Sequence, residues 1–246
     1  MLCAASASSL EEFAYNEGLA RQAFSDNAAG IYPCFAIHPQ MPLRMPPLAA
    51  RDGIEVLESL AAAGRLAAVG ETGFDLFDAD FKATESLQDE LFAAHIDAAL
   101  RYGLPVIIHT RRAMHKIFAA AKSLAKCKAV VFHSWPGTAS DGSALLKRGI
   151  NAYFSFGTPV TLNHRKAMQC AALFPAQRLL TETDAPFQPP RNRDFSTWAD
   201  LQGVIQNIAA LRREAAGGDA GCGGELELEK TIEANFKAVF GDFCPA

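Results

Sequence analysis

The stretch Leu104-Pro105-Val106-Ile107-Ile108-His109 decides the class of fold to which this chain belongs. Its apolar residues stand on consecutive rather than alternating positions, which is typical of a strand in a parallel sheet covered on both faces. The preceding segment, Glu85–Tyr102, carries apolar residues at three- and four-residue intervals, and Gly103 behind it is a typical helix stop. A helix that leads into a buried strand indicates an α/β protein built from βαβ units.

The same alternation of apolar runs and amphipathic segments extends over all 246 residues. It predicts one α/β sheet, either doubly wound or closed as a TIM-type (β/α) barrel, in a single domain spanning residues 1–246. Residues 217–224 are rich in glycine and are predicted to form a surface loop. The predicted strands are Met1–Ser6, Ile31–Ile37, Leu66–Gly70, Leu104–His109, Ala129–His133, Ile150–Phe156 and Arg178–Thr183. The predicted helices are Leu10–Phe24, Gly53–Ala63, Glu85–Tyr102, Ser140–Arg148, Asn163–Leu173, Trp198–Arg213 and Glu225–Phe240.

The composition indicates a globular protein, since 50% of the residues are hydrophobic and 20% are charged. The net charge of -4 provides no overall positive field. A phosphate-ester substrate would therefore have to be attracted by local Arg or Lys side chains or by bound cations. The six cysteines lack C-x-x-C spacing, which favours reduced thiols. With no signal peptide and no apolar run of the ~20 residues that a membrane span needs, we expect a cytoplasmic protein without a membrane partner.

Residues able to bind a metal ion recur where the predicted strands end. Because the carboxyl ends of parallel strands meet at one edge of a sheet, we expect these side chains to converge there. Imidazole and carboxylate ligands together suit Zn²⁺, Mn²⁺ or Mg²⁺ better than Cu(I) or an iron–sulfur cluster. The residues concerned are His38, Glu71, His109, His133 and Asp184.

This set of side chains fits hydrolysis assisted by two cations. Two closely spaced cations could share Glu71 as a bridge and generate hydroxide near neutral pH. The carboxylate of Asp184 could then take the proton from the attacking water. A cation pair would also neutralise the charge that develops on a phosphoryl oxygen, which offsets the negative balance of the chain.

Each of these residues also has an ordinary structural explanation. A single histidine at a strand end is more often hydrogen-bonded in the core or on the surface, and Glu71 and Asp184 could be helix N-caps or surface charges. The metal-site hypothesis is favoured because several such residues occupy equivalent positions on separate strands. The remaining histidines lie within predicted helices and are assigned no role in a site; they are His95, His115 and His164.

Four arginines are candidates for binding phosphate. Arg111 and Arg112 directly follow His109 and could make bidentate contacts to a phosphate, although a solvated loop charge explains them equally well. Arg191 and Arg193 lie in the proline-rich loop after Asp184 and are open to the same two interpretations.

Five short motifs follow one another in a characteristic order. They are Ala36-Ile37-His38-Pro39, Gly70-Glu71-Thr72-Gly73-Phe74-Asp75, Pro105-Val106-Ile107-Ile108-His109-Thr110-Arg111, Phe132-His133-Ser134-Trp135-Pro136-Gly137 and Thr181-Glu182-Thr183-Asp184-Ala185-Pro186. In this order they resemble the TatD family of metal-dependent deoxyribonucleases, and the resemblance covers nearly the whole chain. Gln88, Tyr153–Gly157 and Asn235-Phe236 also fit the family pattern.

The resemblance implies a TIM-type barrel of the amidohydrolase superfamily that binds two divalent cations and hydrolyses DNA, commonly as a 3′→5′ exonuclease. Carried over by position, Glu71 would bridge the metals, and His109 and His133 would hold one of them. Asp184 would ligate the other metal and act as the base. His38 and Arg111 would lie near the substrate phosphate.

The chain departs from the family pattern at its beginning. Family members open with a strand that ends in a His-x-His pair of metal ligands, whereas Met1–Ser6 resembles the family's second strand. We therefore expect seven of the eight barrel strands and a barrel that is incomplete at its N-terminal side. Either the natural protein carries a further βα unit upstream, or the chain is short and retains one complete metal subsite, with only one cation held.

The expected activity is thus a divalent-metal-dependent hydrolase acting on phosphodiester bonds of DNA. Two alternatives remain open: an amidohydrolase-type enzyme acting on a small ester, amide or phosphoester, and a degenerate, non-catalytic barrel. The expected partner is DNA or another phosphoester substrate, and no obligate protein partner is evident.

Overall fold

The computed structural model of the chain describes residues 2–26, 29–217 and 224–243. Within these residues seven strands form one sheet in the order β1 to β7, and the pairings from β1 to β4 and between β6 and β7 are parallel. The sheet and its intervening helices confirm the predicted α/β class of TIM type. The strands are β1 (Leu2–Ala7), β2 (Gly30–Phe35), β3 (Ala68–Asp75), β4 (Val106–Arg111), β5 (Val130–Phe132), β6 (Ala152–Phe156) and β7 (Leu179–Thr181).

The helices follow the predicted order, with differences at their ends. The predicted bounds of α4 and α10 are confirmed, whereas α2 begins at Pro47 rather than Gly53, because proline is well tolerated in the first turn of a helix. Three short helices, α3, α5 and α6, were not predicted. The helices are α1 (Leu10–Ser25), α2 (Pro47–Ala62), α3 (Ala79–Ala83), α4 (Glu85–Tyr102), α5 (Met114–Ala119), α6 (Ala121–Leu124), α7 (Ala139–Lys147), α8 (Arg165–Leu173), α9 (Leu201–Ala215) and α10 (Glu225–Phe240). Short 3₁₀ helices are η1 (Met41–Leu43), η2 (Thr158–Val160), η3 (Ala176–Arg178) and η4 (Trp198–Asp200).

Strand β3 is longer than its apolar run predicts. The run ends at Gly70, but the strand continues to Asp75 because residues 72–75 pair with residues 108–111 of β4. A register shift between Val69 and Thr72 interrupts the ladder at this point. Glu71 therefore lies inside a strand and not in the loop behind it.

The chain divides into two compact units, which are described separately. The first comprises Met1–Val131, Arg148–Asn151 and Val239–Ala246, and the second comprises Phe132–Lys147 and Ala152–Ala238. The single domain expected from the sequence stays a prediction.

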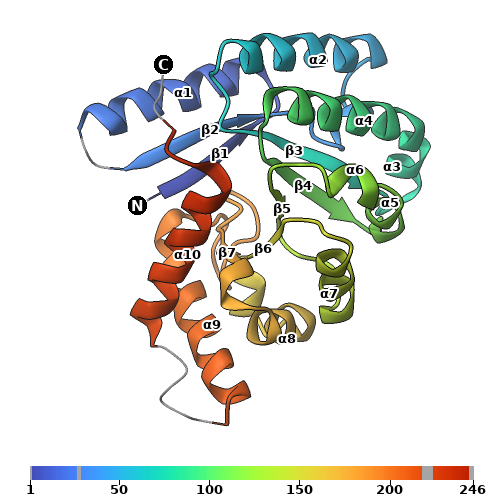
Figure 1. The fold of residues 1–246 in the computed structure, drawn as a ribbon. Coiled ribbons are helices and arrows are strands. Elements are labelled where there is room, and N and C mark those ends of the chain that lie inside the picture. Colours follow the sequence, from blue (N-terminus) through green and yellow to red (C-terminus); the bar gives the residue numbers. More distant parts are fainter. Residues whose placement is uncertain (1, 27–28, 218–223, 244–246) are drawn as a thin grey trace. The chain divides into compact units, whose positions relative to one another are not determined.

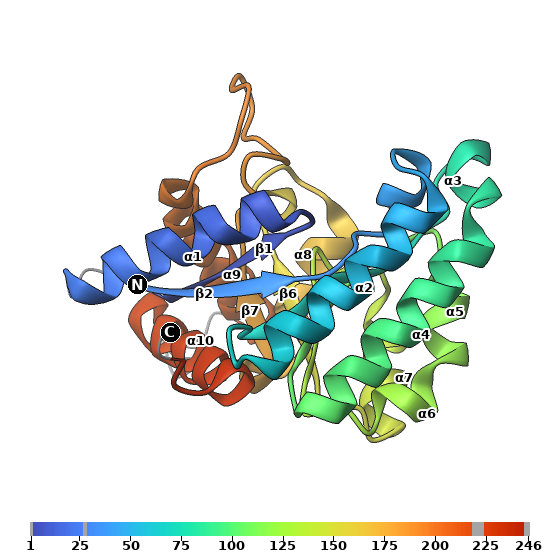
Figure 2. The ribbon, with the colours of Figure 1, turned by 90° about the horizontal axis from the view of Figure 1, so that it is seen from above.

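In the first unit, helices α1, α2 and α4 cover the strands β1 to β4. Helix α1 packs against β2, α4 packs against β3, and α2 packs against α4 (Figures 1 and 2). Two ring contacts mark the interior: Phe13 meets Phe35 edge to face, with centroids 6.2 Å apart, and Phe74 meets Phe92 at 4.7 Å. Burial of these rings removes large apolar surfaces from water and so stabilises this unit.

In the second unit, an aromatic cluster lies under β6 and α8. The rings of Phe154 and Phe174 are 4.3 Å apart, and Trp135 contacts Phe154 at 4.7 Å and Phe132 at 5.4 Å. Helix α9 packs on α8 and on β7. This core supports the ends of β6 and β7, from which the polar residues of the unit extend.

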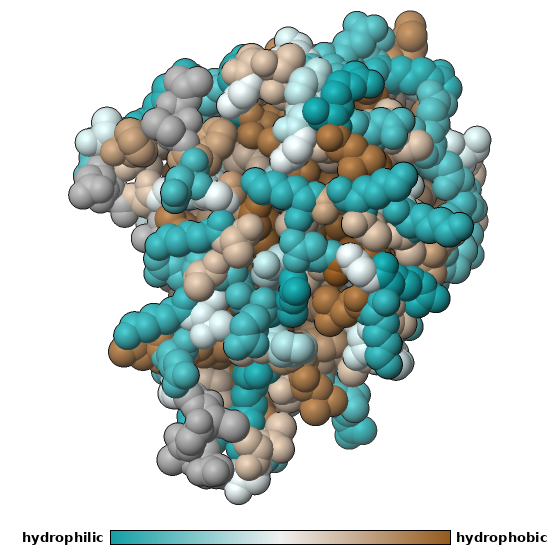
Figure 3. All heavy atoms as spheres, in the orientation of Figure 1, coloured by the Kyte–Doolittle hydropathy of each residue, from teal (hydrophilic) through white to brown (hydrophobic). Residues whose placement is uncertain are grey.

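The surface is mixed in character. Figure 3 shows hydrophilic side chains over much of the visible face, with smaller hydrophobic areas between them. Among the residues that the structure describes, no helix combines the length and apolar character needed to cross a membrane. Cys3, Cys34, Cys127 and Cys170 are free thiols. Cys222, Cys244 and most of the predicted glycine-rich loop lie outside the described residues.

Candidate functional site

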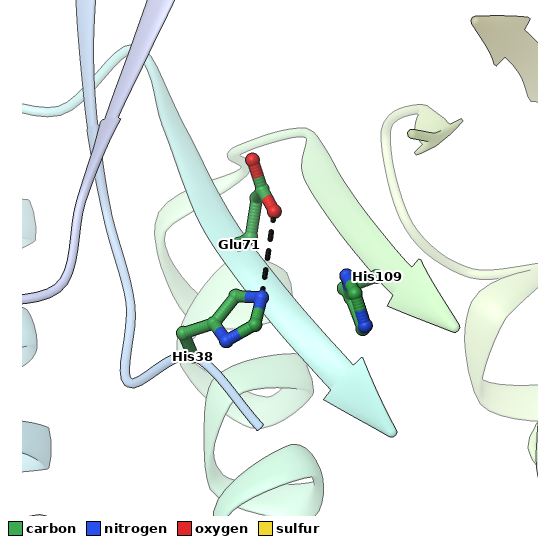
Figure 4. A group of neighbouring side chains, drawn as sticks. All are labelled: His38, Glu71 and His109. Carbon is green, nitrogen blue, oxygen red and sulfur yellow. Dashed lines mark ion pairs between the residues drawn. The ribbon is translucent and has the colours of Figure 1, made fainter. Parts of the chain in front are cut away.

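Three of the predicted site residues lie together in the first unit. His38 follows β2, Glu71 lies in β3 and His109 lies in β4 (Figure 4). One ligand atom from each side chain lies within 4.8 Å of the others. His38 Nε2 is 3.7 Å from Glu71 Oε2, and the rings of His38 and His109 are 4.6 Å apart, edge to face. All three side chains are largely buried but reach solvent.

The hydrogen bonds of His38 bear on its role. The backbone N–H of Gln40 donates to His38 Nδ1 at 3.2 Å. In the neutral ring the proton therefore lies on Nε2, the nitrogen that faces Glu71. This arrangement favours His38 as a hydrogen-bond donor in the site, in keeping with the substrate-side role that the sequence predicts.

A buried carboxylate holds His109. Asp75 Oδ2 lies 3.3 Å from His109 Nε2 and also accepts a hydrogen bond from Gln40 Nε2 at 2.8 Å. Burial disfavours the charged form of Asp75, but hydrogen bonds from His109, Gln40 and the backbone N–H of Phe77 prevail and lower its pKa to about 2. Since the ionised Asp75 accepts from Nε2–H, the lone pair of His109 lies on Nδ1. This is the arrangement by which a carboxylate orients a metal-ligating histidine.

Helix α4 fixes the backbone of these strands through two buried side chains. Gln88 Oε1 accepts the N–H of Asp75 at 2.8 Å, and Gln88 Nε2 donates to the Asp75 carbonyl at 3.0 Å. His95 Nε2 accepts the N–H of Ile37 at 3.0 Å, and His95 Nδ1 lies 2.8 Å from Thr72 Oγ1. The neighbours of His38 and Glu71 in the sequence are thereby tied to one helix.

Gly73 allows β3 and β4 to approach each other beside His109. It has φ of +133°, and a Cβ placed there would overlap the carbonyl oxygen of His109. Only glycine combines this backbone conformation with so close an approach. The second glycine of the Gly-Glu-Thr-Gly motif thus has a steric explanation.

The second unit holds His133, Glu182 and Asp184. His133 Nδ1 is 3.1 Å from Glu182 Oε1, and His133 Nε2 is 3.9 Å from Asp184 Oδ1. Burial opposes ionisation of Glu182, but the charge of His133 and hydrogen bonds from His133 and Ser155 outweigh it and lower its pKa. Glu182 therefore bears a negative charge at neutral pH and orients His133.

Asp184 and two residues near it adopt an unusual backbone conformation. Ser134, Asp184 and Gln188 have φ of +44°, +53° and +50°, a region that non-glycine residues rarely occupy. Gln188 Nε2 links them, because it donates to Asp184 Oδ2 at 2.6 Å and to Ser134 Oγ at 2.9 Å. Such conformations gather at functional sites, where the surrounding structure holds them in place.

Arg111 and Arg112 share one aromatic ring. The guanidinium carbon of Arg111 lies 3.5 Å from the centroid of the Phe77 ring, and that of Arg112 lies 4.3 Å from it. Arg112 also donates to the carbonyl of Phe77 at 2.8 Å. Arg111 Nη1 is 3.9 Å from Asp75 Oδ2, so its charge lies beside the partner of His109. The anion-binding role of Arg111 stays a prediction.

Sequence reasoning missed several residues that shape both clusters. Asp75 and Glu182 lie inside quoted motifs, four residues after Glu71 and two before Asp184. In β3 the alternation of an extended chain brings residues 71 and 75 to the same face. That spacing was an available signal. The hydrogen bonds of Gln40 and Gln188 depend on the conformations of loops, which the sequence does not indicate.

The side chains of both units suit divalent cations. The first cluster offers two imidazoles and a carboxylate, and the second offers one imidazole with two carboxylates. Nitrogen and oxygen donors of this kind bind Zn²⁺, Mn²⁺ or Mg²⁺. His109 and His133 each contact a carboxylate that can orient them as ligands.

Comparisons with known proteins give a consistent result. The model of the family described as TatD related DNase matches residues 3–241. The "3'-5' ssDNA/RNA exonuclease TatD" of Escherichia fergusonii is 32% identical over 197 residues, which cover 76% of this chain and 70% of the relative. An "uncharacterized metal-dependent hydrolase TatD" of Mycobacterium tuberculosis is 32% identical over 166 residues, and the match spans 60% of that protein.

A solved structure shows the same fold. The crystal structure of a TatD homologue from Escherichia coli K12 matches with a TM-score of 0.78 and 24% identity, covering 98% of this chain and 86% of the homologue. At this level of identity the likeness concerns the fold, and it confirms the TIM-type architecture.

Proposed function

The chain belongs to the TatD-related DNase family of metal-dependent hydrolases, and on this premise we propose that it hydrolyses phosphodiester bonds of DNA as a 3′→5′ exonuclease. The observation that carries the proposal is the cluster of His38, Glu71 and His109, in which imidazole and carboxylate atoms converge at a solvent-accessible point. The name of the Escherichia fergusonii relative supports a nucleic-acid substrate.

We assign metal binding to four residues, which lie within a strand or up to three residues after one. Glu71 and His109 serve in the first unit, and His133 and Asp184 serve in the second. Two divalent cations are proposed, and Glu71 would be the ligand that they share. When bound, such cations would supply Lewis acidity toward a phosphoryl oxygen and would lower the pKa of water.

The protein residues orient the substrate and move the proton. Gln188 donates to Asp184 Oδ2 and so fixes the carboxylate that we propose as the general base for the attacking water. His38, with its proton on Nε2, and Arg111, held on Phe77, donate to the phosphate oxygens. Glu71 would act in catalysis as a ligand of the cations. Asp75 and Glu182 hold the two metal-binding imidazoles in their orientation.

The proposal is tested by nucleotide release from a single-stranded DNA labelled at its 5′ end. The chain is depleted of metal with EDTA and assayed after addition of Mg²⁺, Mn²⁺ or Zn²⁺. We expect cation-dependent shortening from the 3′ end, and a loss of about 100-fold or more in Asp184→Asn, as for removal of a general base. Asp52→Asn, at an exposed aspartate on α2, is the matched control and should retain activity.

Three results would contradict the proposal. Undiminished activity of Asp184→Asn would remove the residue from its assigned role. A chain that binds cations but leaves DNA intact would point to a small ester, amide or phosphoester, which a substrate panel would reveal. A chain that binds no cation would favour the non-catalytic alternative, and metal analysis of the purified protein separates these cases.

A further inference from the structure

The loop between β7 and η4 carries large aromatic side chains into solvent. Phe187 and Phe195 are 68% and 56% exposed, and Trp198 at the start of η4 is 66% exposed. Among the described residues three phenylalanines are exposed, and two of them belong to this loop. In Figure 2 the orange segment between β7 and α9 extends as a long loop. Exposed apolar groups of this kind mark interaction sites, because water solvates large rings poorly.

The loop is nevertheless firmly built. Its two ends are tied together by the buried Ser196, whose hydroxyl bonds the carbonyl oxygens of Thr183 (3.1 Å) and Phe187. The N–H of Ser196 donates to the carbonyl of Pro186 at 3.1 Å. These bonds fix the backbone beside two of the rings and leave the rings themselves in solvent.

Further bonds hold the far side of the loop. Arg193 Nη1 donates to Asp200 Oδ1 at 2.8 Å, and the N–H of Thr197 donates to Asp200 Oδ2 at 2.7 Å. These bonds hold the start of η4, where Trp198 stands. A segment with this many internal hydrogen bonds presents its aromatic side chains in a defined arrangement.

Charge and position point to the kind of partner. Arg191 and Arg193 lie between Phe187 and Phe195 in the sequence. Together with Asp194 they give residues 185–198 a net charge of +1, although the whole chain carries -4. The loop also begins directly after Asp184, to which its residue Gln188 is bonded. Aromatic rings interleaved with cations are the pattern by which proteins hold single-stranded nucleic acid. In a duplex the faces of the bases are already stacked and cannot rest on these rings.

We propose that residues 185–198 form a stacking platform for single-stranded nucleic acid, in which bases rest on Phe187, Phe195 and Trp198 and Arg191 contacts a phosphate. This inference rests on the proposed function, because it assigns to the loop the part of the substrate strand that lies beyond the scissile bond. It makes the loop a determinant of affinity for single strands over duplexes.

The first test measures binding without hydrolysis. A fluorescein-labelled single strand of thymidines is titrated with the full chain in EDTA, and a labelled duplex serves for comparison. Base stacking on an aromatic ring corresponds to about five- to 150-fold in affinity per ring, so Phe187→Ala/Phe195→Ala should raise the Kd for the single strand at least tenfold. Tyr15→Ala/Phe24→Ala on α1 is the matched control, because these rings are also exposed, and it should bind as the parent does.

The second test uses tryptophan fluorescence. The chain has two tryptophans, of which Trp135 is buried and Trp198 is exposed. Stacking of bases should quench the emission of Trp198, and Trp198→Phe should abolish the quenching while it retains most of the affinity.

Several outcomes would overturn the inference. In the titration, an unchanged Kd of Phe187→Ala/Phe195→Ala for the single strand would do so. In the fluorescence measurement, no quenching of Trp198 by the single strand would do so. Quenching that is caused instead by anionic phosphatidylglycerol vesicles, or by self-association of the chain, would also contradict it. Because binding is measured without cations, the two proposals fail separately. Ring-dependent binding without nucleotide release would contradict only the proposed hydrolysis, and hydrolysis unaffected by the ring substitutions would contradict only the platform.

Discussion

His95 should make the stability of the chain depend on pH in a way that a single substitution removes. The ring is fully buried, and Nε2 accepts the N–H of Ile37, so the neutral form is required in the folded state. Burial lowers its pKa from an ordinary value of 6.5 to about 3, although a hydrogen bond to the backbone of Leu91 acts in the opposite direction. Between these values the unfolded chain binds more protons, so the free energy of unfolding falls as the pH falls below 6.5. At pH 5 the loss amounts to about 2 kcal/mol.

The substitution His95→Gln isolates this effect. The amide oxygen of glutamine can still accept the N–H of Ile37 but does not titrate. Urea unfolding of both proteins at pH 8 and pH 5 gives the two changes in stability, and the parent should lose about 2 kcal/mol more than the variant. His115→Gln, at an exposed histidine, should behave as the parent does. Equal losses in the parent and in His95→Gln would refute the assignment of a neutral, buried His95.

Three further predictions concern stability and metal binding. Glu17 accepts two hydrogen bonds of 2.7 Å from Arg65, which lower its pKa despite its burial, so Glu17→Gln should cost about 1–3 kcal/mol at pH 7 in urea unfolding. This contribution is present above the ordinary pKa of a glutamate and is lost as the pH falls through the lowered pKa, so parent and variant should converge in acid. Gly73→Ala places a methyl group against the His109 carbonyl, so it should lower both the thermal stability and the metal affinity. Gly64→Ala is the control, because the space around Gly64 is open, and it should leave the metal affinity unchanged. Mn²⁺ or Zn²⁺ at 100 times its Kd should raise the free energy of unfolding by about 2.7 kcal/mol. Calorimetry should show this as a higher melting temperature, which EDTA reverses. An unchanged melting temperature would contradict cation binding to the folded chain.

Much of the architecture could be predicted from local pattern. The consecutive apolar residues of β4 and the helical spacing of α4 indicated a parallel α/β sheet, and both the fold class and the family are confirmed. The strand-end rule also selected His38, Glu71 and His109, which the structure brings together. Their roles as ligands or donors stay predictions.

The parts that could not be predicted depend on contacts between distant segments. The extension of β3 to Asp75 requires pairing with β4, which begins more than thirty residues later, and polar residues gave no apolar pattern to mark it. No role in a site is predicted for His95, because the sequence around a histidine in a helix does not show which distant residues it contacts. Its bonds to Ile37 and Thr72 exist only once α4 has docked on the sheet.

The bond between Gln88 and Asp75 has a consequence for the timing of motion in the first unit. The amide hydrogen of Asp75 is held by a side chain of α4 and not by a neighbouring strand. Exchange of that hydrogen with deuterated solvent therefore requires α4 to move away from β3, an opening that hydrogen exchange follows over minutes to hours. The exchange rate of the Asp75 amide hydrogen therefore reports how often α4 separates from β3. Asp75 is also the carboxylate that holds His109, so the same measurement follows the support of that histidine.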